Sequence, residues 1–112
     1  MKTYPRAERV RHRIKEELAN LLIKEIKDPR LEMVTITHVK VSKDLRNAKI
    51  YYCLTGDTKR RRAAKEGFAK ASGFVKRELA SRLRLRYMPE CSFFYDETFD
   101  YSNKVNQLLK TI

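Results

Sequence analysis

The spacing of apolar residues changes along this chain, and the change restricts the folds that the chain can adopt. Between Pro5 and Ile26 the apolar residues recur every three or four positions, which is typical of a helix buried along one side. Between Val34 and Leu54 they alternate with polar residues, as in strands, and from Thr58 the helical spacing returns. Helices and strands in this order predict an α+β fold whose helices pack on one face of a small sheet.

The strand region is predicted to form a hairpin with an irregularity in its first strand. The valine and isoleucine of VTI fall on one side of the alternating pattern, whereas the two valines of HVKV fall on the other. A bulge near Thr37–His38 would return all four to one face. After a turn at SKDLRN, alternate residues from Ala48 to Leu54 are expected to point inward, and Cys53 outward.

Proline and glycine set the expected ends of the helices. Pro29 disfavours helical geometry at Asp28, so the first helix should end there. Thr58 is the expected N-cap of the second helical region, which runs to about Leu85 and contains Ser72–Gly73 in its middle. Glycine inside a helix costs about 1 kcal/mol relative to alanine. We therefore predict a kink between two helices at this dipeptide.

A third strand and a short C-terminal helix complete the predicted order. Pro89 ends the second helical region, and the segment ECSFFYD that follows places Cys91, Phe93 and Tyr95 on one face. Apolar spacing predicts a short helix over Tyr101–Leu109. The expected order is therefore α-β-β-α-kink-α-β around a three-stranded sheet, followed by a short C-terminal helix.

Length and composition bound the remaining possibilities. A chain of 112 residues suits one compact domain, which we expect to span residues 1–112. No apolar run approaches the roughly 18 residues of a membrane helix, and the first residues lack the apolar centre of a secretory signal. Cys53 and Cys91 are too few for a disulfide framework and lack CxxC spacing. We expect a cytoplasmic protein with no membrane partner, acting as a monomer.

Positive charge is concentrated in the second helical region. The chain has 26 Lys and Arg against 14 Asp and Glu, a net charge of +12, and residues 59–86 contain 11 basic and 2 acidic side chains. A solvated face does not require one sign of charge. The excess therefore favours a nucleic-acid partner, bound through counterion release from phosphates, over an anionic membrane or an acidic protein. The candidate phosphate contacts are Arg60, Arg61, Arg62, Lys65, Lys70, Lys76, Arg77, Arg82, Arg84 and Arg86. Second-rank candidates on the first helix are Arg6, Arg9, Arg11 and Arg13.

The kink at Ser72–Gly73, together with the preceding Ala71, is predicted to shape this nucleic-acid-binding surface. A glycine between two helices permits a bend and lets another backbone come close. One interpretation is packing of helix on strand at this point alone. The other is a bent helix pair that presents a basic concavity to a nucleic-acid backbone.

Motifs for catalysis are absent from the sequence. There is no GxxxxGK[ST], GxGxxG, GxSxG or HExxH, and neither histidine has a second one at ligand spacing. Four carboxylates could hold a metal for nucleic-acid cleavage, but such residues more often cap turns and strand ends: Asp28, Asp44, Glu90 and Asp96. We expect no enzyme activity, no cofactor and no metal.

A set of short motifs is spread over nearly the whole chain: DPRL (Asp28–Leu31), VTITHVKVSKDL (Val34–Leu45), Ala48, KASG (Lys70–Gly73), LRLRYMPE (Leu83–Glu90), Phe93 and Asp96. Together, in this order and spacing, they make the chain similar to a known family, the bacterial ribosome-binding factor A proteins. Cys91 departs from the aliphatic residue expected at its position, which affects packing only.

This resemblance implies a KH-like (type II) fold and a role in ribosome assembly. In a KH fold a GxxG loop normally clamps a nucleic-acid backbone. The family has an Ala-x-Gly kink there, matched by Ala71-Ser72-Gly73, and Gly67 stands too far from Gly73 to complete GxxG. The implied role is a cytoplasmic, non-enzymatic factor that binds the free small ribosomal subunit, contacts its rRNA, and assists late maturation and processing of that RNA. A general single-stranded RNA adaptor and a metal-dependent ribonuclease remain as alternatives.

Overall fold

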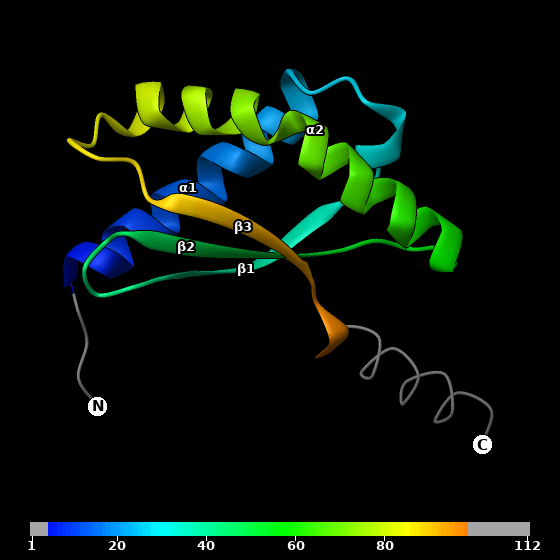
Figure 1. Cartoon of the computed structure of the whole chain (residues 1–112), viewed down its shortest axis with the longest axis horizontal. Helices are drawn as coiled ribbons and strands as arrows, with labels where there is room; N and C mark the ends of the chain where they lie inside the picture. Colours follow the sequence, from blue (N-terminus) through cyan, green and yellow to red (C-terminus); the bar gives the residue numbers. More distant parts are fainter. Residues whose placement is uncertain (1–4, 99–112) are drawn as a thin grey trace.

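Two helices cover one face of a three-stranded sheet in the computed structural model, which describes residues 5–98 (Figure 1). The elements are α1 (Pro5–Lys24), a 3-10 helix η1 (Pro29–Leu31), β1 (Thr35–Val41), β2 (Asn47–Cys53), α2 (Thr58–Leu83) and β3 (Glu90–Tyr95). The α+β prediction and its element order are confirmed. The predicted helix over Tyr101–Leu109 lies outside the described residues.

Strand β2 is the centre of the sheet. It pairs antiparallel with β1, as the hairpin prediction requires, and parallel with β3. The parallel pairing arises because the chain crosses over through α2 between these two strands. The register of β1 shifts between Ile36 and His38, which confirms the predicted bulge. Ile36 and Val39 are consequently both buried.

The core lies between the helices and the covered face of the sheet. Ile14, Leu18 and Leu21 of α1 are completely buried. From α2, the Phe68 ring stacks on Phe93 of β3 with centroids 4.5 Å apart. Alternate residues of β2 point inward as predicted. Cys53, which was expected to point outward, is buried, although it does not belong to the core cluster that contains Tyr52 and Leu54.

The ends of the helices are set by local hydrogen bonds. Helix α1 ends at Lys24, earlier than Asp28, because the backbone N–H of Ile26 donates to the Leu21 carbonyl, five residues back, and so leaves the four-residue pattern of the helix. Pro29 instead begins η1, with Asp28 as its N-cap. The N-cap of α2 is Asp57 and not Thr58, since the Asp57 carboxylate accepts the first-turn N–H of residue 60 at 3.0 Å.

Helix α2 is one continuous helix of 26 residues that runs through the predicted kink. Figure 1 shows its axis changing direction near the middle, so the prediction of a bend is right although the helix is not divided. The Ser72 hydroxyl donates to the Ala69 carbonyl at 3.0 Å, a backbone interaction that often bends helices. The helix ends at Leu83, where Arg84 adopts a left-handed conformation with φ of 53°.

Candidate nucleic-acid interface

The cations of α2 that face away from the core form an exposed row. Lys59, Arg62, Lys70 and Arg77 are spaced by three, eight and seven residues, so they return to one side of the helix, and all four are exposed. Gly73 is exposed on the same side, between Lys70 and Arg77. We call these four cations the outward row. Its members come from one rigid element, so their relative positions are set by the helix.

A second group of cations lies between α2 and the edge strand β3. The Arg61 guanidinium lies 4.1 Å from the centroid of the Tyr95 ring, which is a cation–π distance. Nearer the other end of α2, Lys76 forms an ion pair with Glu90 at 2.9 Å. Around the Arg61–Tyr95 pair is a groove of about 470 Å³ that joins basic and aromatic side chains, lined by Tyr52, Thr58, Arg61, Arg62, Lys65, Phe93, Phe94 and Tyr95. We call this the α2–β3 groove.

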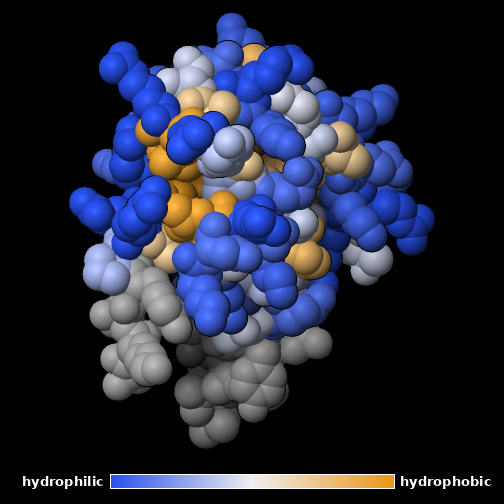
Figure 2. Space-filling model, turned by 60° about the vertical axis from the view of Figure 1, so that its left-hand side comes forward, coloured by the Kyte–Doolittle hydropathy of each residue, from blue (hydrophilic) through white to orange (hydrophobic). Residues whose placement is uncertain are grey.

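Further cations gather at the end of the molecule where the turn after α2 meets the start of α1. Figure 2 brings this end forward and shows a band of apolar surface bordered by hydrophilic side chains. A groove of about 720 Å³ here is lined by Arg6, Asp44, Leu45, Arg46, Leu85, Arg86, Tyr87, Met88 and Glu90. Arg84 and Arg86 are both exposed, and a smaller adjoining groove contains Arg6 and Arg9.

Two of the second-rank candidates on α1 have partners within the fold. The Arg13 guanidinium donates to the carbonyls of Leu83 and Arg82, at 3.1 Å and 2.9 Å. It thereby caps the negative end of the α2 dipole, which is a stabilising arrangement. Arg11 pairs with Glu8 on its own helix at 2.8 Å.

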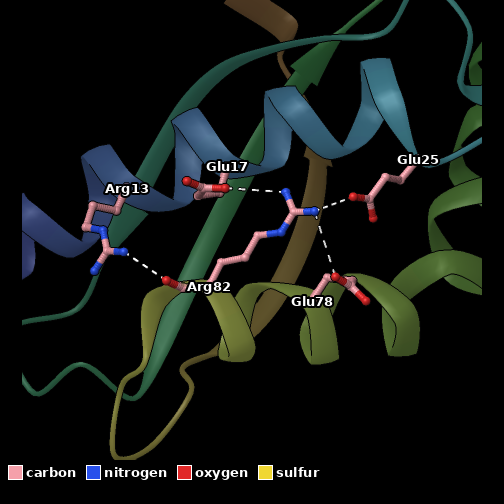
Figure 3. A network of polar contacts seen from close by, with 5 residues as sticks. All are labelled: Arg13, Glu17, Glu25, Glu78 and Arg82. Atoms are coloured by element: carbon pink, nitrogen blue, oxygen red, sulfur yellow. Dashed lines mark hydrogen bonds and ion pairs between the residues drawn. The ribbon is translucent and has the colours of Figure 1, made fainter.

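Arg82 belongs to an ion-pair network between the helices. Figure 3 shows its guanidinium between Glu17 of α1, Glu25 just after the end of α1, and Glu78 of α2. The distances are 3.4 Å, 2.5 Å and 3.8 Å respectively. Three carboxylates compensate this one charge, so Arg82 ties α2 to α1 and offers little positive charge to a ligand. Arg60, on the same flank, donates to the carbonyl of Glu32 at 3.1 Å and remains exposed.

The two glycines in the middle of α2 have opposite surroundings. A β-carbon at Gly73 would meet only the Arg77 guanidinium, at 3.6 Å, so no element packs on the helix there. A β-carbon at Gly67 would come within 3.0 Å of the Leu31 side chain in η1. Close packing therefore occurs at Gly67, and the interpretation of Gly73 as a packing site is wrong. The sequence feature that could have predicted close packing at Gly67 is its position on the apolar side of the second helical region, next to Phe68.

The bend of α2 does not create the expected basic concavity. Figure 1 shows the helix curving over the sheet, and its buried residues, such as Phe68 and Val75, occupy the inner side of that curve. The outward row therefore lies on the convex side, as is usual for a helix that wraps around a core. The cations of α2 that do line a concave surface, Arg61, Arg62 and Lys65, lie in the α2–β3 groove.

Reactive groups in the described part of the chain do not converge on a site. Residues 5–98 contain no group of three His, Cys, Asp or Glu side chains placed to hold a metal. Burial raises the pKa of the Cys91 thiol to about 11, and burial also raises the pKa of Cys53. Neither thiol is therefore suited to act as a nucleophile near neutral pH. Across the same residues, no helix is long and apolar enough to cross a membrane.

Comparisons with known proteins agree with this arrangement. The family described as Ribosome-binding factor A matches residues 6–109. A Ribosome-binding factor A from Desulfatibacillum aliphaticivorans is 51% identical over 112 residues, which cover 100% of this chain and 91% of that protein.

Solved structures share the fold. The solution NMR structure of a Thermotoga maritima protein assigned as a ribosome binding factor A has a TM-score of 0.73 at 31% identity, covering 87% of this chain and 92% of the other. A homology model of the Thermus thermophilus ribosome binding factor A, fitted into a cryo-EM map of a 30S complex, has a TM-score of 0.61 at 22% identity, covering 83% of this chain and 93% of the other. At that identity the second likeness shows the fold alone.

Proposed function

The chain belongs to the ribosome-binding factor A family, and from this premise we propose that it binds the free small ribosomal subunit through the rRNA. We further propose that it assists late maturation and processing of that RNA, as a cytoplasmic, monomeric factor without catalytic activity. The observation that carries the proposal is the outward row of exposed cations on α2, beside the α2–β3 groove. The choice of partner is supported through the family, since a ribosome binding factor A from Thermus thermophilus has been fitted into a 30S complex.

Electrostatic attraction to phosphates explains how the outward row would bind. Lys59 and Arg77 are separated by 18 positions, so the row extends for about 27 Å at 1.5 Å per residue. This length reaches several phosphates of one RNA strand. Each phosphate neutralised by a cation releases condensed counterions, so the affinity falls as the salt concentration rises.

Gly73 gives the outward row a position without a side chain. Because the space around it is open, an RNA backbone can approach the helix there more closely than at any position with a β-carbon. Lys70 and Arg77 flank this position on the same side of α2. The site differs from a GxxG clamp, because Gly67, the other glycine of α2, is buried against η1. We propose that α2 receives an RNA backbone on its convex surface.

Cosedimentation with purified free small subunits at several salt concentrations tests this function. If about six phosphates are neutralised, log affinity should fall against log salt with a slope near −5. The double variant Lys70→Gln/Arg77→Gln should bind more weakly and reduce that slope by about 2. The variant Lys24→Gln/Lys27→Gln removes the same charge from exposed positions near the end of α1 and serves as the control.

The outcomes separate the alternatives. A salt-independent affinity, or an equal loss in both double variants, would contradict binding through the outward row. Equal affinity for unrelated single-stranded RNA would favour a general RNA adaptor. Cleavage of labelled RNA in the presence of magnesium would show a ribonuclease and refute the proposal that the protein is not an enzyme.

A further inference from the structure

The face of the sheet opposite the helices carries aromatic rings from all three strands. His38 of β1 is the register partner of Tyr51 of β2, and Tyr51 is the partner of Phe94 of β3. The His38 and Tyr51 ring centroids are 6.1 Å apart, and those of Tyr51 and Phe94 are 5.6 Å apart. The three rings therefore form one row across the full width of the sheet.

Two lysines lie beside this row. Lys40 and Lys49 are register partners on neighbouring strands, and each lies two residues along its strand from His38 and Tyr51 respectively. The Lys40 ammonium is 5.8 Å from the centroid of the Tyr51 ring. We call the five side chains together the sheet-face platform. Like charges placed opposite each other on a sheet destabilise it, so folding alone gives no reason for this lysine pair.

The sheet-face platform is accessible. Both described helices, α1 and α2, contribute their buried residues to the opposite side of the sheet. Phe94 remains 42% exposed, although it is a large apolar side chain, and both lysines are exposed. The Glu90 carboxylate, at the start of β3, is paired with Lys76 of α2, and the Asp96 carboxylate after β3 accepts a hydrogen bond from the Thr37 hydroxyl. Lys40 and Lys49 therefore place positive charge on one side of the row of rings.

Phe94 also connects the platform with the α2–β3 groove. It lines that groove together with Arg61, Arg62 and Lys65, and it ends the row of rings at the edge strand. A nucleic-acid strand leaving the cations of α2 can thus continue past the edge of β3 onto the open face of the sheet. The path carries positive charge at both ends and aromatic rings between them.

We propose that the sheet-face platform binds unpaired nucleobases of single-stranded RNA, by stacking them on Tyr51 and Phe94 while Lys40 and Lys49 contact the adjacent phosphates. Aromatic side chains on an open sheet are suited to this ligand, because every base has a π-face and bases of a duplex are already stacked on each other. This site lies on a different surface from the outward row and goes beyond the proposed function. It would let the protein hold an unpaired segment next to the RNA backbone bound at α2.

Binding of two RNA probes tests the proposal. The probes are a short oligouridine that forms no base pairs and a blunt RNA duplex, measured by fluorescence anisotropy at one salt concentration. Phe94→Leu and Tyr51→Leu should each weaken oligouridine binding roughly tenfold, as the loss of one stacked base predicts, and leave duplex binding unchanged. Ile23→Ala is the control for the loss of an exposed apolar side chain, because Ile23 is 81% exposed and lies on α1, which covers the other face of the sheet. Ring signals of Tyr51 and Phe94 in NMR spectra of the unaltered protein should shift with oligouridine and not with the duplex.

Three results would overturn the proposal. The first is unchanged oligouridine affinity in both leucine variants together with unshifted ring signals. The second is an equal loss for oligouridine and duplex, which would indicate a structural role. The third is weaker binding to the small subunit with unchanged oligouridine affinity, which would show that the face docks a ribosomal protein. None of these would affect the expected loss of subunit binding in Lys70→Gln/Arg77→Gln, so the two proposals fail separately.

Discussion

Replacing Gly73 by alanine should make the protein more stable, because the structure shows no cost that opposes the gain in helix propensity. Alanine is favoured over glycine inside a helix by about 1 kcal/mol. The added methyl group would meet only the Arg77 guanidinium, at 3.6 Å, which is an ordinary van der Waals distance. For a domain of this size, 1 kcal/mol corresponds to a rise in Tm of roughly 5 °C.

Gly67→Ala is the comparison that isolates the packing term. It brings the same gain in propensity, but its methyl group would lie 3.0 Å and 3.1 Å from two carbons of Leu31. Leu31 is only 4% exposed and cannot move outward freely. Overpacking of this kind costs about 1–3 kcal/mol. We expect Gly67→Ala to be less stable than Gly73→Ala by that amount, with the propensity term cancelling between the two variants.

Urea unfolding followed by circular dichroism measures both free energies. The reasoning is refuted if Gly73→Ala destabilises the protein, or if both variants gain the same stability. Gly73→Ala should also bind the small subunit more weakly than the unaltered protein in cosedimentation, since a methyl group would occupy the position left bare in the outward row. A variant that is more stable and binds equally well would show that the bare position has no role in binding.

The remaining predictions concern the ion pairs and the thiols. Arg82→Ala should lower the free energy of unfolding by about 1–2 kcal/mol, more than an isolated surface pair contributes, because three neighbouring carboxylates lose their common partner. In the same urea assay, exposed Arg77→Ala should stay within about 0.5 kcal/mol of the unaltered protein, and equal effects of the two would contradict a role for the network. The side-chain hydrogen bond from Arg30 lowers the pKa of Asp28 below its usual 3.8. The charged carboxylate therefore stabilises the fold at pH values above 3.8, and this stabilisation is lost as the pH falls through the lowered pKa of the folded protein. Asp28→Asn should therefore be destabilising near neutral pH and equal to the unaltered protein in strong acid, whereas a pH-independent difference in urea titrations would count against the pair. With the pKa of Cys91 raised to about 11, roughly one thiol in a thousand is ionised at pH 8. A disulfide reagent should therefore label Cys91 slowly in the folded protein and faster once urea unfolds it. Rapid labelling of the folded protein would show that the thiol is accessible and ionised.

Local patterns in the sequence were sufficient to predict the helices and strands and the faces that they bury. The bulge in β1 could be predicted because a side-chain period of two must be interrupted if residues of opposite parity face one core, as Ile36 and Val39 do. The helix caps could not be placed as well. Asp57 and Thr58 are both good capping residues, and the choice depends on which one has the extended backbone.

The chain's sequence by itself determined the order of helices and strands, their buried faces and the excess of cations in residues 59–86. These properties depend on neighbours within a few positions, and the repeats of helix and strand are the same in any fold. Only the tertiary structure decided which cations are available. Arg77 and Arg82 look equivalent in the sequence, but Arg82 lies beside carboxylates 57 and 65 residues away. Strand order and register likewise brought together the rings of the sheet-face platform, because contact between distant segments depends on how the whole chain packs.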